Sequence, residues 1–368
     1  MAIDVNFYDA KHREALSNTP QFANIVKIVE SGLTVDEDLW IYCLFKEQKA
    51  RDGFRTYADF ASRLAKRLQL FEDYINLQSK TITSVDDKPE KIISEYVGIG
   101  CALKLVSEIH GLTEADWELI PESRTKDLDF FISSDSTSII EVECKGTFSG
   151  SSRSSMKADI EAKKRVQRTK QNNNHLLYGI ITSYFSDPAI PARADILDPD
   201  PVEVYEDPYY ARLLCRMKYY LIQFNVFSRA HFLISLSERV NGLRYNKEYM
   251  RLDAAPLVGR FGEPFKSPIS FNWKRPFENH SEIIGDIFSV DKETYLFYGL
   301  TEAIVDILIS QSFGAILGFR TQPNTVSVTA TIEGPPEQQV ERKSESIILK
   351  GDLRSNSAGR FIGLMHKA

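Results

Sequence analysis

The sequence predicts an α/β protein with a central mixed sheet, a helical region before it and an α+β region after it. Apolar residues recur at spacings of three and four over residues 21–78 and 89–110, which is the helical period. Over residues 117–145 the period changes to two, which is typical of strands. Residues 176–184 form a continuous apolar run, as expected for a central strand. Helical and strand patterns therefore alternate along the middle of the chain.

The central part is expected to begin with a helix over residues 89–110. Pro89 suits the first turn of this helix, and Gly111 suits its C-cap. Three short strands are then predicted at residues 117–121, 128–132 and 138–145, with a polar turn at 133–137. A charged helix at 156–171 and the strand at 176–184 complete the order helix, three strands, helix, strand.

The segment that follows is predicted to add a loop, a helix and a further strand. Residues 187–208 are rich in Pro and Asp and are expected to form a loop. A helix at 209–227 and a further apolar strand at 231–236 come next. These elements extend the α/β pattern to about residue 239.

The last third of the chain is less regular. Its pattern predicts strands at 268–271 and 326–332 and an amphipathic helix at 301–310. We therefore divide the chain into three regions: a helical N-terminal region (1–88), an α/β core (89–239) and a C-terminal α+β region (240–368). Target recognition or oligomerisation is the expected role of the last region.

Composition narrows the class of protein. The chain has 368 residues, and 43% of them are hydrophobic and 26% charged, which is ordinary for a globular protein. No apolar run approaches the ~20 residues of a membrane span, no secretory signal is visible, and four widely spaced cysteines form no CxxC. We expect a cytoplasmic protein without a membrane partner. The net charge of −6 argues against a non-specific nucleic-acid coat, so nucleic acid would have to bind a local patch.

The strongest candidate for chemistry is a set of charges on two predicted neighbouring strands. The strand period places Glu143 and Lys145 on one face of the third strand, together with Glu141, and Asp129 on the strand before it. Hydrolysis of a phosphodiester needs a divalent cation, and Mg²⁺ (or Mn²⁺) prefers carboxylate oxygens. We expect Asp129 and Glu143 to be its ligands, with the main-chain carbonyl of Cys144 completing the shell. Lys145 would orient the attacking water or offset charge on the phosphate.

A plainer interpretation is that these charges lie on the solvent-facing side of an amphipathic sheet, with Glu143 and Lys145 paired or hydrated. For an isolated Glu-x-Lys this interpretation would be preferred. The context favours chemistry, because Asp129 lies on its own predicted strand, with a helix before the set and a basic helix after it.

This ordered set resembles the PD-(D/E)XK nuclease superfamily, whose restriction-endonuclease-like core has the order α-β-β-β-α-β. The match covers residues 89–184, and by resemblance Asp129, Glu143 and Lys145 take the catalytic positions. Many members add an acidic residue on the first helix. Glu95 is the candidate because it falls on the apolar face of that helix, and Glu90 is the weaker alternative. The chain departs from the motif at Leu128, where the family often has proline.

The helix after the third strand resembles the nucleic-acid-facing helix of that superfamily. Its expected phosphate contacts are Lys163, Lys164 and Arg168, and Arg153 in the preceding serine-rich loop is a further one. The alternative is a solvated face, because Asp159/Lys163 and Glu161/Arg165 have the spacing of helical ion pairs. The sequence leaves both interpretations open.

The resemblance implies a metal-dependent endonuclease acting on DNA, for instance a restriction or anti-phage defence effector that works as a homodimer or with a partner defence subunit. The alternatives are a non-catalytic nucleic-acid-binding or assembly module that keeps the nuclease fold, and a nuclease that acts on RNA or branched DNA. The sequence contains no GxxxxGK[ST] motif, so an NTP-driven step would belong to another subunit.

Overall fold

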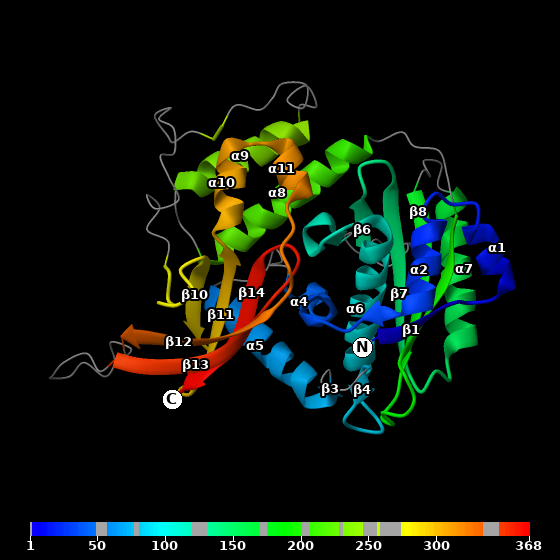
Figure 1. Cartoon of the computed structure of the whole chain (residues 1–368), viewed down its shortest axis with the longest axis horizontal. Coiled ribbons are helices and arrows are strands. Elements are labelled where there is room, and N and C mark those ends of the chain that lie inside the picture. The colour runs from blue at the N-terminus through cyan, green and yellow to red at the C-terminus, as the bar shows by residue number, and fades with distance from the viewer. Residues whose placement is uncertain are drawn as a thin grey trace. The chain divides into compact units, whose positions relative to one another are not determined.

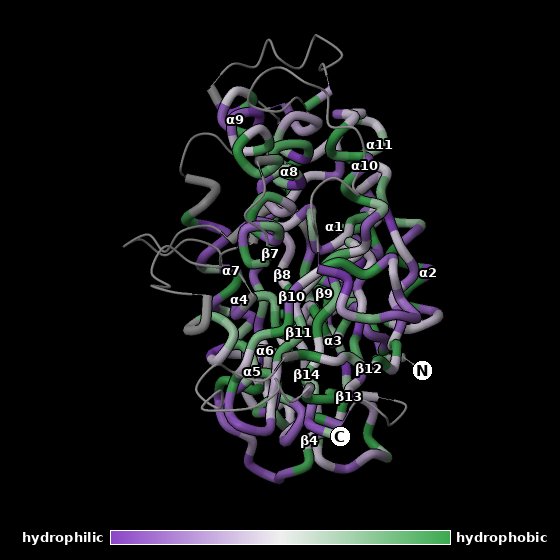
Figure 2. Tube along the Cα trace, turned by 90° about the vertical axis from the view of Figure 1, so that its left-hand side faces the viewer, coloured by the Kyte–Doolittle hydropathy of each residue, from purple (hydrophilic) through white to green (hydrophobic). Residues whose placement is uncertain are grey.

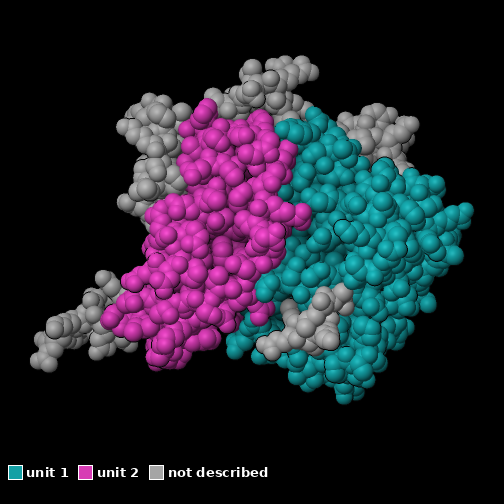
Figure 3. Space-filling view, in the orientation of Figure 1, with its two compact units in different colours: residues 1–49, 67–216 teal, residues 50–66, 217–368 magenta. Residues whose placement is uncertain are grey.

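A computed structural model describes residues 2–48, 57–76, 81–119, 131–169, 175–200, 207–227, 231–245, 256–257, 274–333 and 346–368. The chain divides into two compact units, coloured teal and magenta in Figure 3. Unit 1 comprises residues 1–49 and 67–216, and unit 2 comprises residues 50–66 and 217–368. These units cut across the three regions expected from the sequence, since both N-terminal and central segments contribute to unit 1.

Unit 1 is built on a mixed sheet with the strand order β2-β1-β9-β8-β7-β6-β5. Strands β1, β6, β7 and β8 of this sheet are labelled in Figure 1. In chain order its strands are β1 (Ala2–Phe7), β2 (Leu33–Thr34), β5 (Glu118–Leu119), β6 (Phe131–Ser134), β7 (Ile139–Phe148), β8 (His175–Tyr184) and β9 (Arg193–Asp200). The three strands β5, β6 and β7 are antiparallel neighbours. Strand β8 lies parallel to β7 and antiparallel to β9, which lies parallel to β1. The expected α/β class with a central mixed sheet is confirmed.

Helices surround this sheet. They are α1 (Ala10–Leu16), α2 (Phe22–Ser31), α3 (Glu37–Cys43), α4 (Phe45–Gln48), α6 (Lys91–His110), the 3-10 turn η1 (Glu114–Asp116) and α7 (Arg153–Thr169). Two more helices, α5 (Tyr57–Tyr74) and α8 (Pro208–Phe227), each continue from one unit into the other, and β3 (Ile75–Asn76) pairs with β4 (Thr83–Ser84). Helix α6 ends as predicted, with Gly111 at a left-handed φ of 64° and its N–H donating to the carbonyl of Ser107.

The two helices α6 and α7 cover opposite faces of the sheet. Helix α6 crosses β7 where two glycines meet, since a Cβ on Gly98 would lie 2.4 Å from the main-chain nitrogen of Gly146. Helix α7 packs Ile160 onto the other face, over Gly179 and Ile181 of β8. The apolar stretches of these elements are green in Figure 2. Side chains that alternate along β7 therefore meet α6 and α7 in turn.

Unit 2 contains an antiparallel sheet of order β10-β11-β14-β13-β12. In chain order its elements after α8 are α9 (His231–Tyr245), β10 (Ile283–Ser289), β11 (Thr294–Thr301), α10 (Ala303–Ser310), α11 (Phe313–Gly318), β12 (Thr325–Glu333), β13 (Ser346–Ser355) and β14 (Arg360–Lys367). One face of this sheet packs around Phe277, Phe297, Leu349 and Met365. The predicted helix at 301–310 and strand at 326–332 are confirmed as α10 and β12.

Two predicted elements are wrong, and a third is shorter than predicted. Residues 231–236 begin the helix α9 instead of a strand, because the buried Phe232, Leu236, Val240 and Leu243 continue the helical spacing past the short apolar run. The expected loop 187–208 contains strand β9, and the turn expected at 133–137 is shorter, since β6 continues to Ser134. The strand predicted at 268–271 lies outside the described residues.

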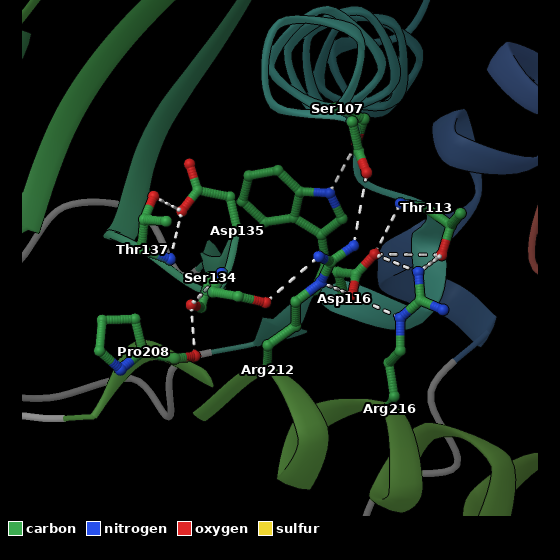
Figure 4. A network of polar contacts seen from close by, with 12 residues as sticks. Ser107, Thr113, Asp116, Ser134, Asp135, Thr137, Pro208, Arg212 and Arg216 are labelled. Carbon is green, nitrogen blue, oxygen red and sulfur yellow. Dashed lines mark hydrogen bonds and ion pairs between the residues drawn. The ribbon is translucent and has the colours of Figure 1, made fainter. Parts of the chain in front are cut away.

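A buried polar network fixes the start of α8 within unit 1 (Figure 4). The carboxylate of Asp116 accepts hydrogen bonds from Arg216 Nε at 2.6 Å and from Arg212 Nε at 2.9 Å. It also caps its own turn by accepting from the main-chain N–H of Thr113 at 2.8 Å. Burial raises the pKa of Asp116, but the guanidinium groups of Arg216 and Arg212 outweigh burial and hold this pKa at about 2. The carboxylate is therefore ionised and forms the centre of the network.

No helix in the described part of the chain combines the length and the apolar character that a membrane span requires.

Candidate active site on strand β7

The alternation predicted for the third strand is present in β7. The buried Ile140, Val142 and Cys144 have even numbers and share the side of Gly146, which α6 crosses. Glu143 and Lys145 have odd numbers and lie under α7, because both contact side chains of that helix. The strand thus presents an apolar face to α6 and a charged face to α7.

Glu143 is completely buried and is held by two ammonium groups. The Nζ atom of Lys163, on α7, lies 2.6 Å from Glu143 Oε1, and Lys145 Nζ lies 2.8 Å from the same oxygen. Lys145 also reaches Asp159 Oδ2 at 2.8 Å. A row Asp159–Lys145–Glu143–Lys163 results, with two carboxylates and two ammonium groups. Such balance is needed, because an unpaired carboxylate with 0% exposure would be very costly.

Of the four expected catalytic residues, the structure brings Glu143 and Lys145 together. Asp129 lies outside the described residues. Glu95 comes from α6, the helix on the opposite face of the sheet, and its carboxylate lies 2.5 Å from Lys46 Nζ. The side chain of Cys144, whose main-chain carbonyl was the expected third ligand, belongs to the α6 face. The expected set is therefore only partly assembled among the described residues.

The basic helix serves the interior of unit 1 more than was expected. Lys163 points to Glu143, and Lys164 is buried and donates to the main-chain carbonyl of Asp198. Lys157, one turn from the start of α7, pairs with Asp9 at 2.9 Å. The side chain of Arg168 lies outside the described residues. Lys163 thus contacts a carboxylate of the sheet, whereas the alternative interpretation expected an ion pair with Asp159 on a solvated face, and Lys164 contacts a main-chain carbonyl, which neither interpretation anticipated.

Arg153 belongs to a second charged group on the same face, which the sequence did not reveal. Its guanidinium and that of Arg193 both hold Asp195, which is completely buried. Ser183 of β8 lies beside Arg193 in register, and its hydroxyl is also buried. The alternation Arg193, Ala194, Asp195, Ile196 is a strand pattern, and it was hidden inside the segment interpreted as a proline-rich loop.

The carboxylate chemistry of Glu143 suits a hard divalent cation, but the described residues alone do not complete a metal site. None of them form a group of three or more His, Cys, Asp or Glu side chains that could hold a metal ion. The Oε1 atom of Glu143 is contacted by two lysines, so a cation bound at this oxygen would displace at least one of them. The second expected carboxylate, Asp129, lies outside the described residues.

Comparisons of the chain with protein-family models, with curated proteins and with solved structures found no significant match.

Proposed function

We propose that this chain is a metal-dependent endonuclease that hydrolyses phosphodiester bonds of DNA, with a role in restriction or anti-phage defence. The observation that carries the proposal is the pair Glu143 and Lys145. A completely buried carboxylate and a partly exposed ammonium, 2.8 Å apart, share one face of a central strand. Burying such a pair is costly, so its presence on a core strand favours chemistry over solubility.

The surrounding elements support the proposal. Along the chain they run α6, β5, β6, β7, α7, β8, which is the order of the superfamily core that the sequence resembles. Strand β7 is antiparallel to β6 and parallel to β8, so a helical crossover is required between β7 and β8, and α7 is that crossover. Glu143 and Lys145 lie in the middle of this arrangement.

In the proposed mechanism Asp129 and Glu143, with the carbonyl of Cys144, would hold Mg²⁺ or Mn²⁺, which supplies Lewis acidity and a hydroxide near neutral pH. Lys145 is 21% exposed, so its ammonium can donate a hydrogen bond to an incoming phosphate oxygen while Glu143 keeps it in place. Lys163 would fix the carboxylate of Glu143 from the helix side.

A non-catalytic nucleic-acid-binding or assembly module remains the second candidate, and one observation favours it. Glu143 is already neutralised by Lys145 and Lys163, which is the arrangement of a structural ion-pair network. The same sheet face would then serve only to stabilise unit 1. A nuclease acting on RNA or branched DNA would use the same residues, because the phosphodiester to be broken is alike.

The test is cleavage of plasmid DNA, RNA and a branched DNA junction with Mg²⁺, Mn²⁺ or EDTA. Asp129→Ala, Glu143→Gln and Lys145→Met are expected to lower the rate by more than about 100-fold. The matched controls are Glu30→Gln and Lys27→Met, whose exposed side chains lie on α2 and whose loss should leave the rate unchanged. Circular dichroism verifies that each variant is folded. Absence of cleavage of all three substrates, or equal cleavage by the folded variants, refutes the catalytic proposal.

A further inference from the structure

We infer that unit 1 has a separate phosphate-binding subsite at the N-terminal end of α7, formed by Arg153, Arg193 and Ser183, and that its ligand is a phosphodiester of the nucleic-acid backbone. The choice of nucleic acid as ligand rests on the proposed function. The subsite itself rests on contacts that do not involve Glu143.

Two guanidinium groups and one carboxylate form the centre of the subsite. Arg153 reaches Asp195 Oδ2 with Nε at 2.9 Å and Nη2 at 2.7 Å. Arg193 reaches the other oxygen, Oδ1, with Nε at 2.7 Å and Nη2 at 2.6 Å. One completely buried carboxylate thus holds two guanidinium groups in fixed positions. These three side chains sum to one positive charge, and the exposed Asp4 of β1 is the register neighbour of Arg193. The arginine side chains are 29% and 38% exposed, so both can reach a ligand in solvent.

The N-terminal end of α7 also favours an anion. Helix α7 begins at Arg153 and has 17 residues, so its first turn presents main-chain N–H groups and the positive end of the helix dipole. The turn before it contains two successive residues with left-handed backbone, Ser149 (φ 62°) and Gly150 (φ 70°). Anions are stabilised at such a helix start. The same end of α7 also carries Arg153.

The buried hydroxyl of Ser183 also lies near the start of α7. Ser183 is 2% exposed, and its Oγ has no hydrogen-bond partner among the residues that the structure describes. A Cβ placed on Gly150 would lie 3.4 Å from this Oγ and 3.6 Å from Arg153 Cδ. The hydroxyl and the arginine side chain therefore converge on the turn at Gly150. A buried hydroxyl without an acceptor costs free energy, and a phosphate oxygen at the helix start would accept the missing hydrogen bond.

The position of the subsite fits one nucleic-acid strand. Ser183 pairs with Thr147 on one side and Arg193 on the other, all on the α7 face of the sheet. Thr147 is two residues beyond Lys145, which corresponds to roughly 7 Å along the strand. A phosphate at the subsite would therefore be a near neighbour of one held at Lys145. We assign the subsite to a phosphate flanking the scissile bond.

The test measures binding of a labelled DNA duplex by fluorescence anisotropy at several salt concentrations, in the Glu143→Gln background so that cleavage does not interfere. Arg153→Gln and Arg193→Gln should each weaken binding about tenfold and lower the salt slope by about 1. Lys27→Gln, which removes an exposed cation of α2, a helix that contacts α6, should change neither quantity.

Ser183→Ala is the decisive variant, because it separates a ligand contact from a structural one. Removing a buried hydroxyl without a partner should leave the melting temperature unchanged or raise it, while DNA binding weakens. A lowered melting temperature with unchanged binding, or arginine variants that bind DNA like the parent, would overturn the subsite. If the wild type cleaves DNA but the variants give these contrary results, the nuclease proposal is supported and the subsite is refuted. If the wild type does not cleave DNA but binding depends on both arginines, the subsite is supported and the nuclease proposal is refuted.

Discussion

Replacement of Lys163 by methionine tests how the buried Glu143 is held. Methionine keeps most of the unbranched side chain but removes the ammonium group that lies 2.6 Å from Glu143 Oε1. A hydrogen bond to a charged group contributes about 1.5–3 kcal/mol, and Glu143 is completely buried, so water cannot replace the lost partner. Lys145 stays 2.8 Å from the same oxygen, so the variant avoids the larger destabilisation that a buried charge without any partner would cause. We expect a destabilisation of about 2 kcal/mol.

Lys157→Met is the matched control. Lys157 lies on the same helix and also pairs with an acid, but that acid, Asp9, is 38% exposed. Solvent screens such a pair, so its loss should cost at most about 1 kcal/mol. The two variants make the same replacement on the same helix and differ chiefly in the burial of the carboxylate.

The assay is urea denaturation followed by tryptophan fluorescence, because Trp40 and Trp117 are buried in unit 1. Equal unfolding free energies for the two variants would refute the assignment of Lys163 to Glu143. A Lys163→Met protein that is as stable as wild type but binds DNA with a salt slope lower by about 1 would instead show that Lys163 contacts phosphate.

Two further predictions concern contacts that position the sheet. Asp116→Asn should destabilise the protein by about 3–5 kcal/mol in denaturant titrations, because the buried guanidinium of Arg216 would lose the carboxylate to which its Nε and Nη2 donate. In the wild type, burial raises the pKa of Asp116 but the arginines hold it at about 2, below its ordinary value of 3.8, so this carboxylate's stabilisation should be complete above about pH 4 and disappear as the pH falls through 2. Gly146→Ala should lower the melting temperature by more than about 5 °C, because its Cβ would lie 1.8 Å from the carbonyl oxygen of Ser94 and α6 would have to move. Retention of wild-type stability by either variant would contradict the packing described for it.

Local patterns predicted the elements that carry the site. The alternation in β7 placed Glu143 and Lys145 on one face, and the continuous apolar run of residues 176–184 identified the central strand β8. Both rest on nearest-neighbour rules of the chain, namely strand period and burial on two faces. The sequence was therefore sufficient to find the pair and the strand beside it.

Long-range pairing could not be predicted in the same way. Strand β1 is formed by residues next to the N-terminus, yet its partner is β9, almost 190 residues later in the chain. Strand β9 begins after two prolines, Pro188 and Pro191, and carries Arg193 and Asp195, so composition alone suggested a loop. The face on which a helix lies is also a tertiary property. Glu95 and Glu143 could both be placed on their own elements, but nothing local showed that α6 and α7 cover opposite sides of β7.

The charge balance of the α7 face leads to a last prediction, which rests on the proposed function. The row of Asp159, Lys145, Glu143 and Lys163 carries no net charge. With the carboxylate of Asp129 this set would carry one negative charge. A divalent cation alone would change that to one positive charge, and a phosphodiester bound beside the cation would bring it to zero. Metal and nucleic acid should therefore bind cooperatively, and by linkage each should raise the affinity for the other by the same factor.

Calorimetric titration with Mn²⁺, with and without a phosphorothioate duplex that retains the backbone charge, measures this coupling. We expect the duplex to tighten Mn²⁺ binding about tenfold or more, which is an ordinary coupling free energy of about 1.4 kcal/mol. Glu143→Gln should abolish the coupling, because it removes a proposed ligand, whereas Glu30→Gln should leave it intact, because that side chain is exposed on α2. Mn²⁺ affinity that is the same with and without the duplex would show that charge balance at Glu143 does not govern metal entry.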